Sequence, residues 1–248
     1  MSNIDDILND FQKKCGIKTR GKRNIDVFPT GFVELDKALG IGGLPKGTTT
    51  EISGSPGVGK SVLSYQLMKE AQSKGAIILY VDADRAFNPS YADRVGVNLS
   101  ELIICTPETG ELALQVIYHY LAYHLVNMVI IDSIPALLPL EELMGDKTNT
   151  AQAKLITTMM KELVSTIEHS NVVLVCINQV RHSFRFGGST TPFNNIFGYY
   201  ASLRIHLTKV KTIKKWRKLK GFIVEANVHK NRWADRAITN FELPIITK

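Results

Sequence analysis

The sequence has 248 residues, of which 44% are hydrophobic and 21% charged, and its formal net charge is +7. These proportions are those of an ordinary folded protein. The sequence contains no run of 18 apolar residues and begins with an acidic rather than an apolar stretch, so we expect neither a transmembrane helix nor a secretory signal. The three cysteines are odd in number and unclustered, which argues against a disulfide framework or a zinc site and for a reducing cytoplasm.

Positive charge is concentrated in two segments of the chain. Residues 13–23 contain six Lys or Arg residues, residues 204–220 contain eight, and neither segment contains an acidic residue. Two basic blocks on an otherwise balanced chain indicate a polyanionic partner such as nucleic acid. The alternative for either block alone is a solvated charged face.

The N-terminal segment predicts a short amphipathic helix followed by a basic linker. Four apolar residues fall at helical spacing on one face between residues 3 and 15, and residues 17–23 have the composition of a linker. Four apolar residues cannot stabilise a helix alone, so the helix should dock on its own domain or on a neighbouring molecule. We therefore expect an N-terminal segment, residues 1–26, and a core domain, residues 27–248.

Within the core, apolar runs alternate with helical segments up to about residue 199. This alternation predicts an α/β fold with a mostly parallel sheet flanked by helices on both faces, and its end predicts an antiparallel C-terminal extension. Polar residues at the carboxyl ends of the parallel strands should meet at one edge of the sheet. The expected strands are residues 48–53, 76–81, 102–105, 126–131, 172–177, 201–209, 221–228 and 238–243, and the expected helices are residues 33–39, 62–68, 110–124 and 151–169.

A phosphate-binding loop is the most informative motif. Residues 54–61 match G-x-x-x-x-G-K-[ST] between a predicted strand and a predicted helix. Glycines let backbone N–H groups converge on a phosphate, and the helix adds its positive dipole end. Lys60 would supply charge to the β- and γ-phosphates and Ser61 a hydroxyl ligand for Mg²⁺; the alternative is a simple glycine turn. The expected nucleotide-binding residues of this segment are Gly54, Ser55, Pro56, Gly57, Val58, Gly59, Lys60, Ser61 and Val62.

Polar residues end three further predicted strands. Asp132 is placed to complete the Mg²⁺ shell with the serine of the loop, the alternative being a helix cap. Either Asp82 or Asp84 could polarise the attacking water, the other being a cap or an ion-pair partner. Gln179 carries an uncharged amide that could sense a γ-phosphate.

Two irregular segments leave the sheet at the same edge. Residues 181–196 mix basic, aromatic and small residues with little hydrophobic periodicity, as a contact with single-stranded nucleic acid requires. Residues 141–150 form the other segment and include Lys147 and Asn149. This placement predicts that nucleotide state and loop order are coupled.

Taken together, these motifs resemble the RecA recombinase family, over residues 27–248. The phosphate loop is closer to that of RadA-like members than to the bacterial recombinase form. The resemblance ends with the last core strand, so we expect a minimal RecA/RadA-type ATPase core that lacks the C-terminal lid domain. The matching blocks are residues 30–32, 35–36, 38–40, 42–47, 54–61, 80–84, 88–92, 107–111, 129–133, 177–181, 200–204 and 230–232.

This resemblance implies an ATPase that uses ATP and Mg²⁺, polymerises on single-stranded DNA and exchanges strands with a homologous duplex. ATP would lie between adjacent subunits of a helical filament, and the N-terminal helix resembles the segment that packs on the next protomer. Asp84 matches the family's water-activating Glu, which is one methylene longer, and Gln179 matches its γ-phosphate sensor. With Lys60 they are the catalytic candidates.

The resemblance also implies contacts to the base, to the neighbouring subunit and to DNA. Asn88 and Tyr91 match positions beside the adenine, whereas Lys230 and Arg232 match two lysines that reach a neighbour's ATP phosphates. Residues 141–150 and 181–195 match the two DNA-binding loops, the second being shortened here. The DNA-binding candidates are Lys147, Asn149, Lys154, Lys161, Arg181, Arg185, Phe186, Thr190, Thr191, Asn194 and Asn195.

Three functions remain open on this basis. The first is a cytoplasmic, DNA-dependent ATPase of homologous recombination that forms filaments and does not associate with a membrane. The second is a recombination mediator that binds ATP and DNA but hydrolyses weakly, which the short Asp84 side chain favours. The third is a ring-forming ATPase with a RecA fold, against which the lack of a second ATPase repeat counts.

Overall fold

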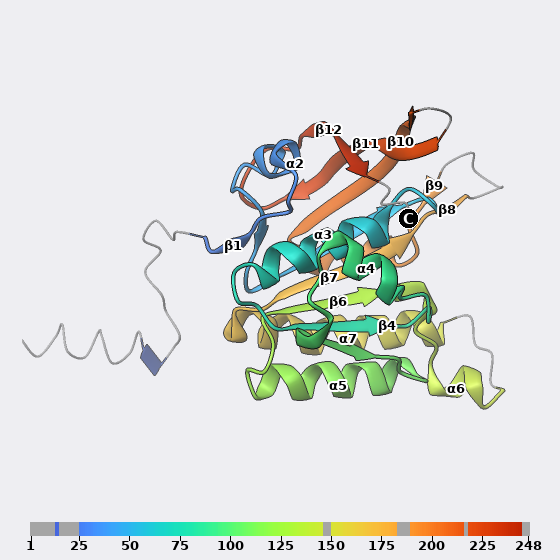
Figure 1. Ribbon diagram of the computed structural model, residues 1–248. Helices are drawn as coiled ribbons and strands as arrows, with labels where there is room; N and C mark the ends of the chain where they lie inside the picture. The colour runs from blue at the N-terminus through green and yellow to red at the C-terminus, as the bar shows by residue number, and fades with distance from the viewer. Residues whose placement is uncertain (1–12, 15–24, 146–149, 183–188, 216–217, 245–248) are drawn as a thin grey trace, which may run out of the picture.

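A computed structural model describes residues 13–14, 25–145, 150–182, 189–215 and 218–244. Its centre is an eight-stranded sheet in the order β12-β11-β10-β3-β7-β6-β4-β5 (Figure 1). The strands from β10 to β5 pair in parallel, and β10, β11 and β12 pair antiparallel. The predicted parallel sheet with an antiparallel C-terminal extension is therefore confirmed. The strands of this sheet are β3 (Thr48–Gly54), β4 (Ile78–Asp82), β5 (Leu102–Cys105), β6 (Met128–Asp132), β7 (Val173–Gln179), β10 (Leu203–Lys215), β11 (Lys218–Asn231) and β12 (Ile238–Pro244).

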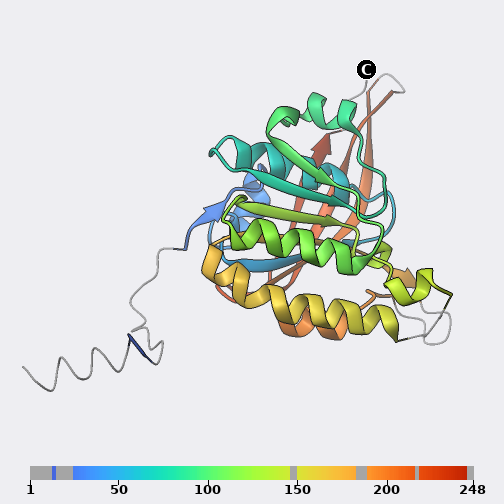
Figure 2. The same ribbon diagram turned by 90° about the horizontal axis from the view of Figure 1, so that it is seen from below.

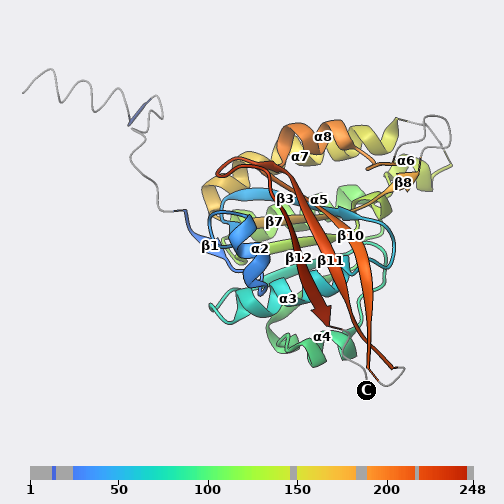
Figure 3. The same cartoon turned by 90° about the horizontal axis from the view of Figure 1, so that it is seen from above.

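Helices cover both faces of the sheet, as Figure 3 shows. In Figure 2 the green helix α5 and the yellow helix α7 lie side by side beneath the strands. Short elements complete the fold, and none of the described helices is both long and apolar enough to span a bilayer. One face carries α5 (Gly110–Ala122), α7 (Ala151–Ser170) and α8 (Asn194–Tyr200), and the other carries α2 (Val33–Ala38), α3 (Lys60–Gln72) and α4 (Pro89–Val95). The short elements are α6 (Leu140–Leu143), the 3-10 turns η1 (Leu99–Glu101) and η2 (Ile134–Ala136), and the paired strands β1 (Val27–Phe28) with β2 (Leu44–Pro45) and β8 (Arg181–His182) with β9 (Ser189–Thr190).

Two hydrophobic cores lie on the two faces of the sheet. Along β4, Ile78 and Tyr80 belong to the core beneath α3, whereas Leu79 and Val81 belong to the core beneath α5 and α7. Successive side chains of a strand point to opposite faces, so a strand covered on both sides must be apolar throughout. The unbroken apolar runs of the sequence have this cause, and they hold the ends of the strands in fixed positions.

Several predicted boundaries need correction. The strands β10 and β11 have 13 and 14 residues, longer than predicted, because they continue as a hairpin beyond the sheet. Lysines such as Lys209 and Lys211 are exposed there, which hides the periodicity of a strand. Residues 181–196 are not irregular throughout, since β8 pairs with β9 and α8 begins at Asn194. Of the predicted N-terminal helix, only residues 13 and 14 are described, and both are helical.

Candidate nucleotide site

A cavity of about 480 Å³ opens where the carboxyl ends of β3, β4, β6 and β7 meet. The phosphate loop forms one wall, and acidic and amide side chains from the neighbouring strands form another. The position agrees with the rule that ligands bind at the carboxyl ends of parallel strands. The lining residues are Pro56, Gly57, Gly59, Lys60, Ser61, Val62, Asp84, Tyr91, Asp132, Gln179 and Phe222.

The backbone of the phosphate loop needs glycine at two of these positions. Gly57 and Gly59 have φ angles of +73° and +103°, a region that side-chain-bearing residues rarely adopt. Gly59 is the N-cap of α3, and Lys60 begins the helix. The first turn of a helix has N–H groups without intrahelical partners, so α3 presents donors and a positive dipole end to the cavity.

The ammonium group of Lys60 is hydrogen-bonded to the backbone of the phosphate loop. Its Nζ donates to the carbonyl oxygens of Gly54 at 2.9 Å and Ser55 at 3.0 Å, and the residue is 8% exposed. Burial lowers the pKa of Lys60, and the negative charges of Asp132 and Asp84 oppose this shift. A buried ammonium group beside the loop glycines is suited to binding a phosphate.

Two oxygen groups in the cavity fit a magnesium ion. The Ser61 hydroxyl donates to Oδ2 of Asp132 at 3.0 Å, and the buried Tyr80 hydroxyl donates to the same oxygen at 2.8 Å. Burial raises the pKa of Asp132, whereas these two hydrogen bonds lower it. Among the described residues no cluster of three or more His, Cys, Asp or Glu side chains could hold a metal alone. The Ser61 hydroxyl and the Asp132 carboxylate fit Mg²⁺, which binds through one or two protein oxygens, water and substrate phosphates.

Of the two acidic residues at the end of β4, Asp82 and Asp84, the structure favours Asp84 as the residue that faces a bound nucleotide. The Asp82 carboxylate accepts hydrogen bonds from the backbone N–H groups of Ala86 at 2.9 Å and Phe87 at 3.1 Å, so it caps the following turn. Asp84 lines the cavity instead. Of the two alternatives in the sequence, Asp82 therefore has the capping role and Asp84 has access to a bound nucleotide.

Ser133 links Asp84 to Gln179, a role that was not predicted. The Ser133 hydroxyl lies 3.1 Å from Oδ2 of Asp84, to which it donates, and 3.4 Å from Nε2 of Gln179, from which it accepts. The only available signal was its position directly after Asp132 at the end of β6. The three side chains form one chain of hydrogen bonds along the cavity wall.

The cavity also has an aromatic part to its lining. Tyr91 and Phe222 line it, and the Tyr91 hydroxyl donates to the carbonyl oxygen of Pro244 at 3.3 Å. The ammonium group of Lys209 lies 3.7 Å from the centroid of the Phe222 ring. Phe222 was missed because it lies on β11, far from the loop in sequence. Asn88 caps α4 by accepting the N–H of Tyr91 at 2.9 Å, so its side chain has a structural role.

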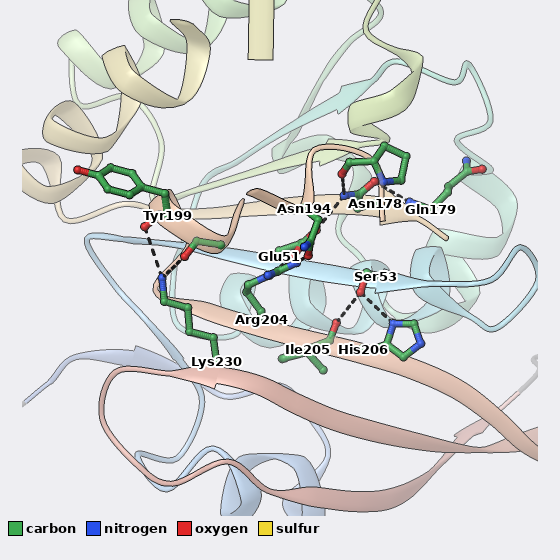
Figure 4. A network of polar contacts seen from close by, with 12 residues as sticks. Glu51, Ser53, Asn178, Gln179, Asn194, Tyr199, Arg204, Ile205, His206 and Lys230 are labelled. Atoms are coloured by element: carbon green, nitrogen blue, oxygen red, sulfur yellow. Dashed lines mark hydrogen bonds and ion pairs between the residues drawn. The ribbon is translucent and has the colours of Figure 1, made fainter. Parts of the chain in front are cut away.

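Six other predicted nucleotide-binding residues are not among those that line the cavity. Gly54, Ser55 and Val58 belong to the loop but are not among the lining residues, and neither are Asn88, Lys230 and Arg232. In its own chain, Lys230 donates to the carbonyl oxygens of Gly198 at 2.7 Å and Tyr199 at 3.4 Å (Figure 4). The contact of Lys230 with a neighbouring subunit stays a prediction.

The DNA-binding candidates are only partly described. Lys154 and Lys161 are exposed on α7 and, being seven residues apart, lie on the same side of the helix. Asn194 and Asn195 are exposed in the first turn of α8, rather than in a loop, and Thr191 precedes them. Arg181 and Thr190 are paired in the β8–β9 ladder. Lys147, Asn149, Arg185 and Phe186 lie outside the described residues.

Comparison with known proteins identifies the family. The model of the RecA N-terminal domain matches residues 2–246. "Protein RecA" of Rickettsia bellii is 37% identical over 250 residues, which cover 94% of this chain and 73% of that protein. "Protein RecA" of Rickettsia canadensis is 38% identical over 234 residues, or 91% of this chain and 68% of the relative. The "Mitochondrial DNA repair protein recA homolog" of Dictyostelium discoideum is 36% identical over 244 residues, 93% of this chain but only 54% of the relative, so the chain spans about half of that protein's length. The chain belongs to the RecA N-terminal domain family.

Proposed function

We propose that the protein is a DNA-dependent ATPase of homologous recombination, which forms a filament on single-stranded DNA and promotes strand exchange with a homologous duplex. The cavity carries this proposal, because it joins a phosphate loop, the Ser61–Asp132 pair, Asp84 and Gln179 in a member of the RecA family. The names of the relatives, "Protein RecA" and "Mitochondrial DNA repair protein recA homolog", support the same assignment.

In this mechanism the chain binds both the phosphates and the base of ATP. Backbone N–H groups of the loop and the Lys60 ammonium hold the phosphates, and the aromatic side chains of Tyr91 and Phe222 pack against the base. Ser61 and Asp132 would hold Mg²⁺, which when bound would neutralise charge on the phosphates.

Asp84 then accepts a proton from the attacking water. Ser133 orients the carboxylate, and the amide of Gln179 lies at the same wall, where it can contact the γ-phosphate. An aspartate is one methylene shorter than the glutamate of the family pattern, so we expect slow turnover. This observation also favours the second candidate, a mediator that binds ATP and DNA and barely hydrolyses.

The DNA contacts are assigned to the two loops and to nearby basic residues. Lys154 and Lys161 present positive charge on one side of α7, next to the segment of residues 141–150. The β10–β11 hairpin carries a separate group of exposed lysines, Lys209, Lys211 and Lys214. Each group of positive charges supports a polyanionic partner.

Assembly into a filament would complete the ATP site. Lys230 and Arg232, which do not line the cavity of their own chain, match the two lysines of the family that reach a neighbour's ATP phosphates, and we assign them that role. We assign residues 1–26 as the polymerisation segment and residues 27–248 as the ATPase core. A cytoplasmic location, which the cysteine pattern favours, is part of the same proposal.

Joint-molecule formation tests the proposed function. Single-stranded DNA and a homologous linear duplex are incubated with the protein, Mg²⁺ and either ATP or a non-hydrolysable analogue. We expect joint molecules with both nucleotides and complete loss with Lys60→Ala, whereas Lys69→Ala, an exposed lysine on the same helix, serves as the matched control and stays active.

Two other outcomes would change the assignment. Binding of ATP and single-stranded DNA without joint molecules, and without hydrolysis, would favour the mediator. Joint molecules formed equally well by Lys60→Ala would overturn the nucleotide-dependent mechanism.

A further inference from the structure

Glu51 is a buried carboxylate in the middle of the sheet that takes no part in the nucleotide cavity. It lies on β3, is 1% exposed, and is not one of the residues that line the cavity. A buried charge is costly unless its hydrogen bonds are satisfied. Both of its oxygens are satisfied: Oε1 accepts from Nδ2 of Asn178 at 2.8 Å, and Oε2 accepts from Nε of Arg204 (Figure 4).

Asn178 holds the two ends of the second loop, residues 181–195, together. It is fully buried at the end of β7, and its Nδ2 also donates to the carbonyl oxygen of Pro192 at 2.8 Å. Its Oδ1 accepts the backbone N–H of Gln179 at 2.9 Å. One side chain therefore contacts a residue that precedes the loop and a residue at its far end, and Glu51 fixes the orientation of that side chain.

Arg204 makes a second connection to the same end of the loop. It pairs in register with Glu51 across the β3–β10 ladder, and its Nη2 donates to Oδ1 of Asn194 at 2.7 Å. Asn194 begins α8, whose last turn accepts hydrogen bonds from Lys230. Glu51 thus reaches the far end of the loop twice, through Asn178 and through Arg204.

We propose that Glu51 is a positioning residue that joins both ends of the second loop to Gln179, so that a change in the loop is transmitted to the wall of the nucleotide cavity. The proposal rests on the proposed function, which gives the loop and Gln179 their roles. The physical basis is a connected set of hydrogen bonds. Glu51 accepts from Asn178 and Arg204, and these two side chains also donate to Pro192 and Asn194 at the far end of the loop. Displacing the loop ends would break the hydrogen bonds of Asn178 to Pro192 and of Arg204 to Asn194. Because Asn178 and Arg204 are also the two partners of the buried Glu51 carboxylate, the loop ends and Gln179 move together.

The test compares Glu51→Gln with the intact protein in three measurements: affinity for an ATP analogue, turnover without DNA, and turnover with single-stranded DNA. Glu51→Gln keeps the shape of the side chain but removes its charge and its acceptor for Arg204. We expect affinity and DNA-free turnover to change by less than about threefold, and the stimulation by DNA to fall about tenfold. Asp36→Asn is the matched control, because it changes a partly buried carboxylate that accepts the N–H of Thr30 far from the loop.

A second variant separates positioning from simple loss of stability. Arg204→Met removes the same ion pair from the other side, so its effect on DNA stimulation should not add to that of Glu51→Gln in the double variant. Equal losses in all three measurements, with Asp36→Asn behaving alike, would make Glu51 a merely structural residue. Unchanged DNA stimulation in Glu51→Gln would also overturn the inference.

Hydrogen exchange gives a readout that does not depend on hydrolysis. In Glu51→Gln, exchange should rise together at the amide of Gln179 and in residues 192–200, whereas the amides of β4 and β6 stay protected. If the intact protein showed no DNA-stimulated turnover, the proposed function would fail. Hydrogen exchange in Glu51→Gln would still show whether Glu51 connects the loop ends to Gln179. Unchanged exchange at Gln179 would contradict the link.

Discussion

The hydroxyl group of Ser133 donates to the carboxylate of Asp84, at 3.2 Å from Oδ1 and 3.1 Å from Oδ2. The same oxygen accepts a hydrogen bond from Gln179, and the preceding residue, Asp132, contacts Ser61. Two adjacent residues at the end of β6 therefore serve the site. Asp132 is the candidate Mg²⁺ ligand, and the Ser133 hydroxyl orients Asp84, the candidate base. ATP hydrolysis at this site depends on which of two acidic side chains, Asp82 or Asp84, can contact a water molecule in the cavity.

Asn substitutions at Asp82 and Asp84 should separate these two carboxylates. Asp84→Asn removes the proton acceptor, so ATP turnover should fall by about 10²- to 10⁴-fold with little change in ATP affinity. Asp82→Asn weakens only a turn, because its oxygens accept backbone N–H groups, and should cost about 1 kcal/mol of stability. Steady-state kinetics and urea unfolding measure the two effects.

The reverse result would reassign the base. If Asp82→Asn lost turnover while folded and Asp84→Asn kept it, Asp82 would be the residue that activates water. Asp84→Glu provides the conservative control, since it restores the family residue and should raise turnover.

Tyr80→Phe should raise the Mg²⁺ concentration needed for half-maximal turnover. The lost hydroxyl donates to Asp132, and this hydrogen bond lowers a pKa that burial raises. Without it the carboxyl group keeps its proton to higher pH, and protons compete with Mg²⁺ more strongly as the pH falls. A Mg²⁺ titration at about pH 6 and about pH 8 should show the larger effect at the lower pH.

Tyr118→Phe is a suitable control for this measurement, because Tyr118 is an exposed tyrosine on α5. An equal Mg²⁺ requirement for Tyr80→Phe and the intact protein at both pH values would refute the role of Tyr80.

His206 should make the protein less stable in mild acid. Burial lowers its pKa from the ordinary value of 6.5, and the positive charges of His229 and Lys60 act in the same direction. Below pH 6.5 the unfolded chain therefore binds a proton that the folded chain does not, so the free energy of unfolding falls as the pH falls. Urea unfolding at several pH values should show this slope.

His206→Gln should flatten that slope, because glutamine does not titrate and keeps a polar group near the Ser53 hydroxyl, which lies 3.1 Å from the ring. An unchanged pH dependence in this variant would show that other groups cause the loss.

Two inactive variants should restore activity when they are mixed. If Lys230 serves the neighbour's ATP, a subunit with Lys230→Ala still has an intact phosphate loop, and a subunit with Lys60→Ala still has an intact Lys230. At an interface between the two, one complete site forms, so the mixture should hydrolyse ATP although neither variant does alone. A mixture as inactive as its components, with filaments still forming, would show that Lys230 does not act across an interface.

The features that could be predicted from the sequence are those that a short stretch of chain determines. The loop at residues 54–61 was recognisable because the strand, the glycines and the helix follow one another, and Asp132 because it ends an apolar strand. The continuous apolar runs likewise predicted buried parallel strands. The sequence could not show which of Asp82 and Asp84 is the candidate base. The answer depends on two backbone N–H groups that approach Asp82 only in the folded turn.

Contacts between distant segments were not predictable in this way. Glu51 and Arg204 are 153 positions apart, and Glu51 is an unexpected charge within a buried strand until its partners are known. Phe222 reaches the cavity only because β11 pairs with β10 beside the phosphate-loop strand. The start of α8 depends on Phe193, whose φ of +60° is rare for a residue with a side chain.

ATP turnover measured with and without single-stranded DNA, for the intact protein and for Lys60→Ala, tests the central claim most directly. A DNA-dependent recombination ATPase predicts that DNA raises turnover of the intact protein at least about tenfold, because ordered loops complete the site, and that Lys60→Ala has no turnover in either condition. Equal turnover of the intact protein with and without DNA, or hydrolysis by Lys60→Ala, would contradict the account.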